Sequence, residues 1–357
     1  MDTVVSIFIF LVMFTIVVFA HEFGHFLFAK LNGIGVVEFF IGMGPTLLHF
    51  TKGGTKYSLK LFPIGGACMF EGEDGVVRDD KTVPIEEIEG AFVNAGVWKR
   101  IATVVAGPVF NFILAFIFSM IIVGFCGSDK PVIQGVMDGY PAQAAGIQAG
   151  DLVTKVGKEK IHVYRQISLI SAINKGEELI IEYERDGKSH VTTIKPQFDE
   201  ESGRYYIGIL GSGELVECKG FDLFRYSSYE MKYWFGYTFK CLKMLFSGQL
   251  TKDDVAGPVG MTQQINETYE MVKPYGFSSV LFTMMEFATL ISVNLGVLNL
   301  LPIPALDGGR LLFMFIEVVR GKPIPPEKEG IVHLIGMLAL FALMIFVFFN
   351  DIMRLFR

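Results

Sequence analysis

Residues 19–26 have the sequence FAHEFGHF and lie inside an apolar run that extends from residue 4 to residue 31. On an α-helix, residues four apart lie on one face, roughly 6 Å apart along the axis. His21 and His25 can therefore direct their ring nitrogens at one metal ion, and Glu22 can accept a proton from a water molecule beside them. The surrounding residues are mostly Phe, Leu, Ile, Val and Met, so we expect this helix to lie in lipid.

The same pattern has an alternative interpretation, in which two histidines and a glutamate pack in a helical bundle without a metal. The membrane setting weighs against it, because these side chains are costly to bury in hydrocarbon unless a partner compensates. A metal ion compensates, but a catalytic metal needs a third protein ligand and an open coordination position.

The composition indicates a membrane protein with several spans and a soluble insert. Of the 357 residues, 51% are hydrophobic and 34 are Phe, which is too apolar for an ordinary soluble protein. The net charge of −6 is spread along the chain, and no basic block indicates binding of nucleic acid. The four cysteines lie far apart with no C-x-x-C pair, which argues against a disulfide framework or a zinc–cysteine site.

Four transmembrane helices are predicted from long apolar runs. They lie within residues 1–31, 99–126, 278–320 and 331–351. The first is expected to be a retained span and not a cleaved signal peptide, because Asp2 lies near its start and no Lys or Arg precedes Lys30. Between the first two spans, residues 32–98 are predicted to form a membrane-associated β-region and a loop, since residues 56–61 alternate between polar and apolar. Its charged part, residues 71–90, is expected to be a solvated surface loop.

Residues 128–213 have a soluble composition and are predicted to form a small α+β domain. Strands are expected at residues 132–136, 152–157 and 179–194, the last as a hairpin with an Asp-Gly turn, and a helix is expected at residues 163–174. The pattern P-A-x-x-A-G, followed by Gly-Asp at 150–151, resembles a PDZ domain. PDZ domains bind extended peptide ends by strand addition; a spacer or size filter that binds no peptide is an equal alternative.

Residues 220–275 are predicted to form an interfacial amphipathic helix and a loop. Ten aromatic residues between 221 and 250 are interleaved with lysines, as in helices that lie on a membrane surface. A tight turn is expected at residues 255–260.

The third span ends at the sequence NLLPIPALDGGR, residues 299–310. Pro302 and Pro304 stop the helix, because each lacks an amide donor and clashes with the preceding turn. A short helix is expected to restart at residues 311–319. Asp307 at this break is the missing anionic ligand. In the second span, Asn111 follows the kinking Pro108, and either close helix packing or a role in lining the site explains it.

Lys and Arg residues predict the orientation in the membrane. They flank the region between spans one and two and occupy the loop between spans three and four, so both are expected to be cytoplasmic. The N-terminus and the PDZ-like domain are then extracytoplasmic, and the metal site lies toward the cytoplasmic side.

Together the H-E-F-G-H and N-L-L-P-I-P-A-L-D-G motifs resemble the site-2 protease family of intramembrane metalloproteases. The single PDZ-like insert resembles the bacterial regulator-of-sigma branch of that family. The resemblance implies an α-helical polytopic membrane protein with a membrane-associated β-region and an inserted PDZ-like domain. It implies one Zn²⁺ held by His21, His25 and Asp307, with Glu22 as general base. Asn299 would bind the substrate backbone or stabilise the oxyanion. Further substrate-binding residues are assigned at Gly65, Gly66, Asn111, Pro302 and Pro304.

The resemblance also implies the substrates, which would be single-pass transmembrane proteins in a bacterial plasma membrane. Anti-sigma factors and signal-peptide remnants fit this description, after an upstream site-1-type protease has removed their bulky external part. A metal-binding transporter or receptor without hydrolysis is the alternative, since intramembrane His and Asp would suit it too. A scaffold in which only the PDZ-like domain functions is a third interpretation.

Overall fold

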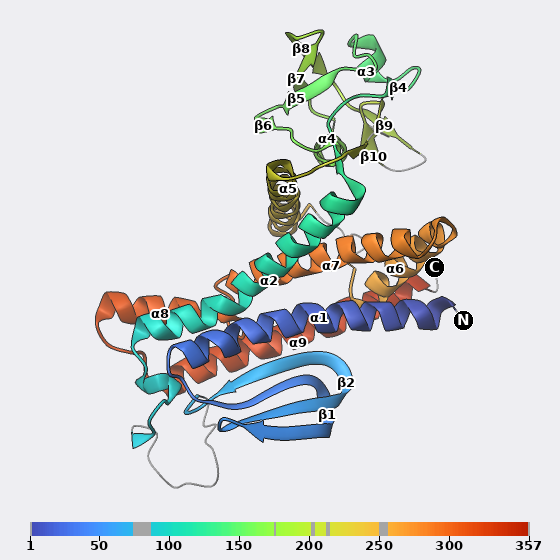
Figure 1. Cartoon of the computed structure of the whole chain (residues 1–357). Helices are drawn as coiled ribbons and strands as arrows, with labels where there is room; N and C mark the ends of the chain where they lie inside the picture. The colour runs from blue at the N-terminus through green and yellow to red at the C-terminus, as the bar shows by residue number, and fades with distance from the viewer. Residues whose placement is uncertain are drawn as a thin grey trace. The chain divides into compact units, whose positions relative to one another are not determined.

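The computed structural model describes residues 2–73, 87–174, 176–200, 204–211, 215–249 and 256–355. The chain forms two compact units (Figure 1). The first, called the membrane unit, contains residues 1–118 and 240–357, and the second, called the PDZ-like unit, contains residues 119–239.

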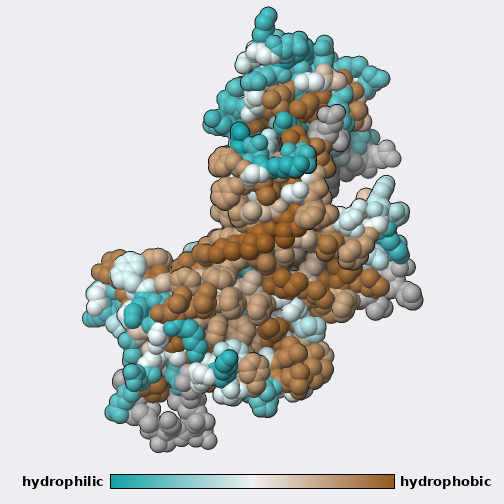
Figure 2. Space-filling view, in the orientation of Figure 1, coloured by the Kyte–Doolittle hydropathy of each residue, from teal (hydrophilic) through white to brown (hydrophobic). Residues whose placement is uncertain are grey.

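Among the described residues, four helices are long and apolar enough to cross a membrane. They are α1 (Asp2–Leu31), α2 (Val97–Cys126), α7 (Phe277–Leu300) and α9 (Pro326–Leu355). Apolar side chains cover much of the helical surface (Figure 2), and the most apolar stretch of α9 contains no buried residue. Such exposure would be unfavourable in water but suits contact with lipid tails. The prediction of a four-span polytopic protein is confirmed.

The β-region consists of β1 (Val36–Lys52) and β2 (Thr55–Phe70), which pair antiparallel and are strongly bulged. Residues 38–41 of β1 pair with residues 66–69 of β2 on one side and with residues 56–59 on the other, so the two strands fold back into a broad sheet. Aromatic contacts such as Phe26–Tyr57 fix the sheet against α1. Most of the charged loop predicted after β2, residues 74–86, lies outside the described residues. The short η2 (Phe92–Asn94) leads into α2.

The third span ends as predicted near the prolines, but the helix after it begins earlier than expected. The irregular segment is residues 301–306, and α8 (Asp307–Arg320) starts at Asp307 and not at Leu311. Asp307 is thus the first residue of a helix, where a carboxylate is favoured by the helix dipole.

The loop predicted before α7 is largely wrong, because it contains α6 (Pro258–Val272) and η3 (Lys273–Tyr275). The expected turn at 255–260 contains the start of α6, with Pro258 at a first-turn position that suits proline. Asp351 of α9 is 2% exposed, and its carboxylate accepts hydrogen bonds from the amides of Gly257 and Gly260. This long-range cap stabilises the helix start, and a local sequence pattern cannot reveal it.

The PDZ-like unit is built on a four-stranded sheet of order β6-β5-β7-β8. Its strands are β5 (Leu152–Val156), β6 (Glu159–Lys160), β7 (Leu179–Arg185) and β8 (Lys188–Ile194). The predicted hairpin turns at Asp186 and Gly187, which have φ of 51° and 73°. The predicted helix is α4 (Tyr164–Ile173), which buries Ile167 against strand residues such as Ile181 and Ile194.

Short elements complete this unit. They are β3 (Ser128–Asp129), β4 (Gly135–Val136), α3 (Pro141–Ala144), β9 (Gln197–Asp199), β10 (Arg204–Tyr206), β11 (Ile209–Leu210) and β12 (Leu215–Val216). The strand predicted at 132–136 is only the two-residue β4. The amide of Ile133 donates a hydrogen bond to the carbonyl oxygen of Asp151, whereas the amide of Gln134 donates one to that of Leu210, so the segment does not pair with a single strand. The long amphipathic helix is α5 (Phe221–Phe246), within the expected range.

Candidate active site

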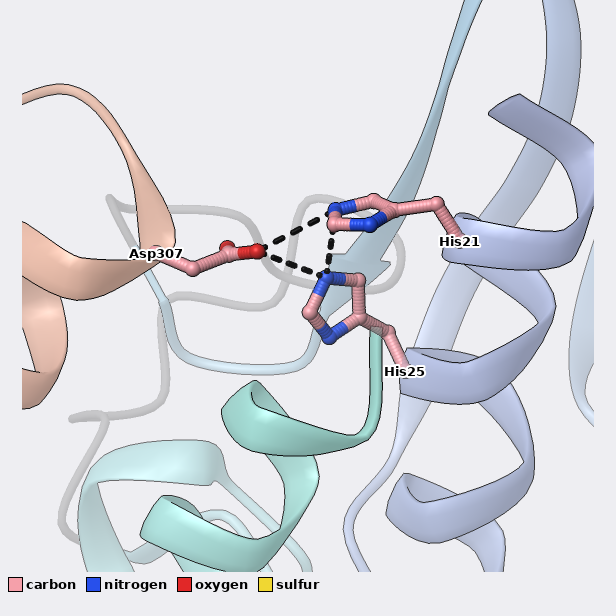
Figure 3. Close-up of side chains that lie close together, drawn as sticks. All are labelled: His21, His25 and Asp307. Carbon is pink, nitrogen blue, oxygen red and sulfur yellow. Dashed lines mark hydrogen bonds and ion pairs between the residues drawn. The ribbon is translucent and has the colours of Figure 1, made fainter. Parts of the chain in front are cut away.

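Three side chains from distant parts of the sequence converge in the membrane unit (Figure 3). The Nε2 atoms of His21 and His25 lie 3.2 Å apart, and Oδ2 of Asp307 lies 3.1 Å and 3.3 Å from them. Both histidines are buried, with 7% and 6% of their surface exposed. In a tetrahedral site with bonds of 2.0–2.1 Å, ligand atoms lie roughly 3.3 Å apart. The three atoms therefore have the spacing of three corners of such a site.

The spacing of residues on an α-helix places the two histidines on one face of α1. The irregular segment 301–306, called the break, places Asp307 opposite them. Residues 301–306 turn back against the start of α8, where side chains do not fit. A Cβ at Gly308 would lie 2.0 Å from the carbonyl oxygen of Leu301, and one at Gly309 would lie 2.6 Å from that of Ile303. The glycine pair is therefore required for the close approach that presents Asp307.

Helix α9 supports the same break. Ala305 has a φ of 76°, which is unusual for a residue other than glycine. Its amide donates a hydrogen bond to Nδ1 of His333 at 2.9 Å. A Cβ at Gly336 would meet Pro304, so α9 packs directly on the break.

Helix α2 packs closely behind the histidines. Nδ1 of His25 lies 2.9 Å from the carbonyl oxygen of Thr103, and Nδ1 of His21 lies 3.1 Å from the side-chain amide of Asn111. A Cβ at Gly24 would lie 2.4 Å from the carbonyl oxygen of Ala106, and one at Gly107 would lie 2.3 Å from Nε2 of His25. The small residues of α1 and α2 let the two helices approach at the level of the site.

A cavity of about 420 Å³ opens on the three side chains. Glu22 lines it, together with residues 67–70 of β2 and residues 305–307, where the irregular segment meets α8. Gly66 lets β2 pack closely on β1 beside the glutamate, since a Cβ there would lie 2.9 Å from the carbonyl oxygen of Phe40. Arg310 and Glu73 form an ion pair of 2.8 Å among the lining residues. The site thus combines three ligand-type atoms, one carboxylate base and room for a peptide.

Cys68 also lines this cavity, but its environment disfavours the thiolate. Burial, followed by the charges of Glu22 and Glu73, raises the pKa of the Cys68 thiol above its ordinary value. A thiol that stays protonated is a poor metal ligand and a poor nucleophile. The chemistry therefore falls to the histidines and carboxylates.

The structure places the other predicted site residues away from the cavity lining, as far as the described residues define it. Asn299 is 9% exposed, in the last turn of α7 before the break. Pro302 lies in the break and Pro304 packs on α9. Gly65 has a φ of 81° and packs on Met43.

Asn111 is fully buried and does not line the cavity, and its side chain lies 3.1 Å from Nδ1 of His21. Two groups that contact His25 were not predicted from the sequence. The Thr103 carbonyl has no side-chain signal, and Gly107 was visible only as part of a small-residue notch beside Pro108.

Comparison with known proteins agrees with this geometry. Residues 9–343 match peptidase family M50. The chain is 33% identical to the zinc metalloprotease RasP of Shouchella clausii, with 97% of this chain and 98% of the relative covered. It is 30% identical to the regulator of sigma-W protease RasP of Bacillus subtilis, over the same shares of both chains.

A shorter similarity links the chain to a solved structure, the PDZ domain of an SdrC-like protein of Listeria monocytogenes. It has 27% identity and a TM-score of 0.20, and it covers 22% of this chain and 84% of that domain. The match to family M50, by contrast, includes all of the residues in Figure 3. The chain therefore belongs to peptidase family M50, the site-2 protease family, and is an intramembrane metalloendopeptidase.

Proposed function

We propose that this protein is a zinc endopeptidase that cleaves transmembrane segments of single-pass proteins after an upstream protease has trimmed them. The observation that carries the proposal is the close triangle of His21, His25 and Asp307 beside Glu22, in which both histidines and the glutamate come from a helix that is apolar enough to span a membrane. A peptide bond reaching this cavity would itself lie at membrane depth.

The residues fit one zinc ion. Two imidazoles and one carboxylate form a donor set typical of catalytic zinc, which leaves a fourth position open. Among the described residues, none donates a hydrogen bond to the buried Oδ2 of Asp307, although both ring nitrogens lie close to it. Three lone-pair-bearing atoms at this spacing repel one another unless a cation lies between them. His21, His25 and Asp307 would hold the ion.

The residues of the chain would then have separate catalytic roles. Zinc, when bound, would supply Lewis acidity to a water molecule and to the scissile carbonyl. Glu22 would accept the proton of the attacking water and later donate it to the leaving amine. Asn299, in the last turn of α7 before the break, would bind the substrate backbone or stabilise the oxyanion.

Substrate presentation requires an unwound helix, because the amides of a helix are hydrogen bonded within it. Among the residues that the structure describes, residues 66–70 of β2 pair with β1 along one edge and have no partner strand along the other, and residues 67–70 line the cavity. An extended substrate segment could add to the second edge by β-augmentation. Gly65 and Gly66 would keep that edge free of bulk.

For the PDZ-like unit, one observation favours a size filter over a peptide binder. The carbonyl oxygens of Gly208 and Leu210 accept hydrogen bonds from the amides of Met137 and Gln134, which flank β4. Carbonyl groups alternate in direction along a strand, so the Ile209 carbonyl points to the opposite edge of β11. The hydroxyl of Tyr164, at the start of α4, donates a hydrogen bond to that carbonyl at 3.1 Å. The Ile209 carbonyl, which an added peptide strand would use as a hydrogen-bond acceptor, therefore already accepts a hydrogen bond within the unit.

We also propose a plasma-membrane location, with the site toward the cytoplasmic side and the PDZ-like unit outside. The placement of Lys and Arg in the loops supports this sidedness. The name of the Bacillus relative, a regulator of sigma-W, supports anti-sigma factors as one substrate class. Signal-peptide remnants are a second class of short, pre-trimmed membrane segments.

The test uses the full-length protein purified in detergent, with metal content measured and a model transmembrane substrate supplied. Glu22→Gln should retain zinc and lose cleavage by at least about 10²-fold, since proton transfer contributes typically 10²–10⁴-fold. Glu267→Gln, on the exposed face of α6, is the matched control and should cleave like the parent. A Glu22→Gln protein that cleaves at the parental rate would refute the mechanism. Zinc flux into liposomes that is independent of Glu22 would favour the transporter alternative.

A further inference from the structure

The two histidines of the site are held from behind by different kinds of group. Nδ1 of His25 faces the backbone carbonyl oxygen of Thr103 at 2.9 Å. A carbonyl oxygen can only accept a hydrogen bond, so this nitrogen carries the proton. A neutral ring of His25 then has its lone pair on Nε2, which faces His21 and Asp307.

Nδ1 of His21 faces a side chain whose two ends differ. It lies 3.1 Å from the side-chain nitrogen Nδ2 of Asn111, which is fully buried in α2, and Oδ1 of Asn111 has no hydrogen-bond partner among the described residues. With the amide NH₂ toward the ring, Nδ1 accepts and the proton of a neutral ring resides on Nε2, where it blocks a metal. With the amide oxygen toward the ring, Nδ1 donates and the lone pair lies on Nε2. The two ends have the same shape, so the hydrogen-bond network decides between them.

The backbone of Asn111 is fixed independently of that choice. Ser292 of α7 donates a hydrogen bond of 2.8 Å to its carbonyl oxygen, and this bond is buried. A Cβ at Gly296, one turn further along α7, would lie 2.5 Å from the ring of Phe112, so the two helices are in close contact here. The segment of α2 that carries the amide group is therefore fixed beside His21 by its contacts with α7.

We propose that Asn111 is a positioning residue for the metal, with its amide oxygen accepting the Nδ1 proton of His21. The bond fixes the tautomer and the ring plane, so that Nε2 of His21 presents a lone pair beside those of His25 and Asp307. Outer-shell partners of this type typically contribute about 10–100-fold to metal affinity. This assignment replaces a substrate-binding role for Asn111 and rests on the zinc site of the proposed function.

The test measures zinc dissociation constants of the full-length protein by competition with a chromophoric chelator. Asn111→Leu keeps the volume but removes the acceptor, and it should weaken zinc binding by about 10–100-fold. Asn111→Asp keeps an oxygen acceptor and should bind zinc within a few-fold of the parent. Ser119→Ala, a buried polar position on the same helix, should bind like the parent. The absorption spectrum of bound Co²⁺ should change in Asn111→Leu and remain parental in Asn111→Asp.

The outcomes separate the two levels of inference. A parent protein that binds no zinc would refute the proposed zinc site itself. A parent that binds zinc while Asn111→Leu binds equally tightly, with the same Co²⁺ spectrum, would refute only the role of Asn111. Thermal unfolding of the metal-free proteins checks that Asn111→Leu is folded. If it is not, Asn111→Asp decides, because a folded Asp variant that loses zinc would overturn the proposal.

Discussion

Gly107→Ala should abolish most of the activity by adding a single methyl group. Gly107 lies on α2 beside the site, and a Cβ there would lie 2.3 Å from Nε2, 2.5 Å from Cε1 and 2.9 Å from Cδ2 of His25. Ordinary van der Waals contact begins near 3.4 Å. The imidazole would have to move by about 1 Å, or α2 would have to move away from α1 by a similar distance.

Either movement is large on the scale of a metal site, where ligand distances hold within about 0.2 Å. A misplacement of about 1 Å can reduce catalysis by roughly 10²-fold. We therefore expect kcat/KM to fall by about 10²-fold or more, with weaker zinc binding. Overpacking would cost about 1–3 kcal/mol, while the higher helix propensity of Ala would return up to about 1 kcal/mol. The net loss of stability should be small, so the protein should remain folded.

The assay compares cleavage of a model transmembrane substrate and zinc content in the parent, Gly107→Ala and Gly124→Ala. Gly124 is the matched control, because it lies on the same helix and its Cβ would meet Leu223 at an ordinary 3.5 Å. The control should retain parental activity and zinc. A Gly107→Ala protein with full zinc and parental kcat/KM would show that α2 does not press on His25 as the structure indicates.

Three further predictions concern the support of the site and the PDZ-like unit. His333→Leu removes the acceptor for the Ala305 amide and should weaken zinc binding about fivefold, the equivalent of a hydrogen bond of about 1 kcal/mol. His333→Gln keeps an acceptor and should weaken zinc binding less. If zinc titrations gave His333→Leu the same affinity as the parent, the support role of His333 would be contradicted. A substrate with a folded external domain should be cleaved at least tenfold more slowly than its trimmed form, and equal rates in the cleavage assay would rule out a size filter. Burial raises the pKa of Asp151, but hydrogen bonds from Arg185 and Gln148 outweigh it and hold that pKa below its ordinary value. The stabilisation is therefore present above the unfolded pKa of about 3.9 and is lost as pH falls through the folded value. The protection factors of the β7 amides, which are exchange rates corrected for the intrinsic effect of pH, should fall below about pH 4 in the parent and less so in Asp151→Asn. An identical pH dependence of the protection factors would contradict the linkage.

The spans and the three converging side chains could be predicted from the sequence, because each leaves a local signal. A run of apolar residues marks a span wherever it occurs, and the i, i+4 spacing of His21 and His25 fixes their common face before any tertiary contact forms. Asp307 was identified because two prolines and two glycines surround it. These residues constrain the backbone by themselves.

The features that could not be predicted depend on partners far away in the chain. Helix α6 begins under the carboxylate of Asp351, 91 residues after the capped Gly260. The early start of α8 depends on how residues 301–306 fold back against Gly308. The contact of Asn111 with His21 spans 90 residues, and nothing in the sequence around Asn111 states which side of α2 faces α1.

The same long-range contacts explain how hydrolytic chemistry can occupy a helix that faces lipid. In the described structure, different elements hold the polar groups of the site: Thr103 and Asn111 of α2 contact the histidines, and α9 packs on the segment that leads into Asp307. Each polar group therefore points inward, and the apolar side chains of the same helices remain outside. A bound metal would join α1 to α8 directly. It follows that metal binding and the packing of these helices are one coupled equilibrium, so that a substitution on α2 or α9 can be read out as a change in metal affinity.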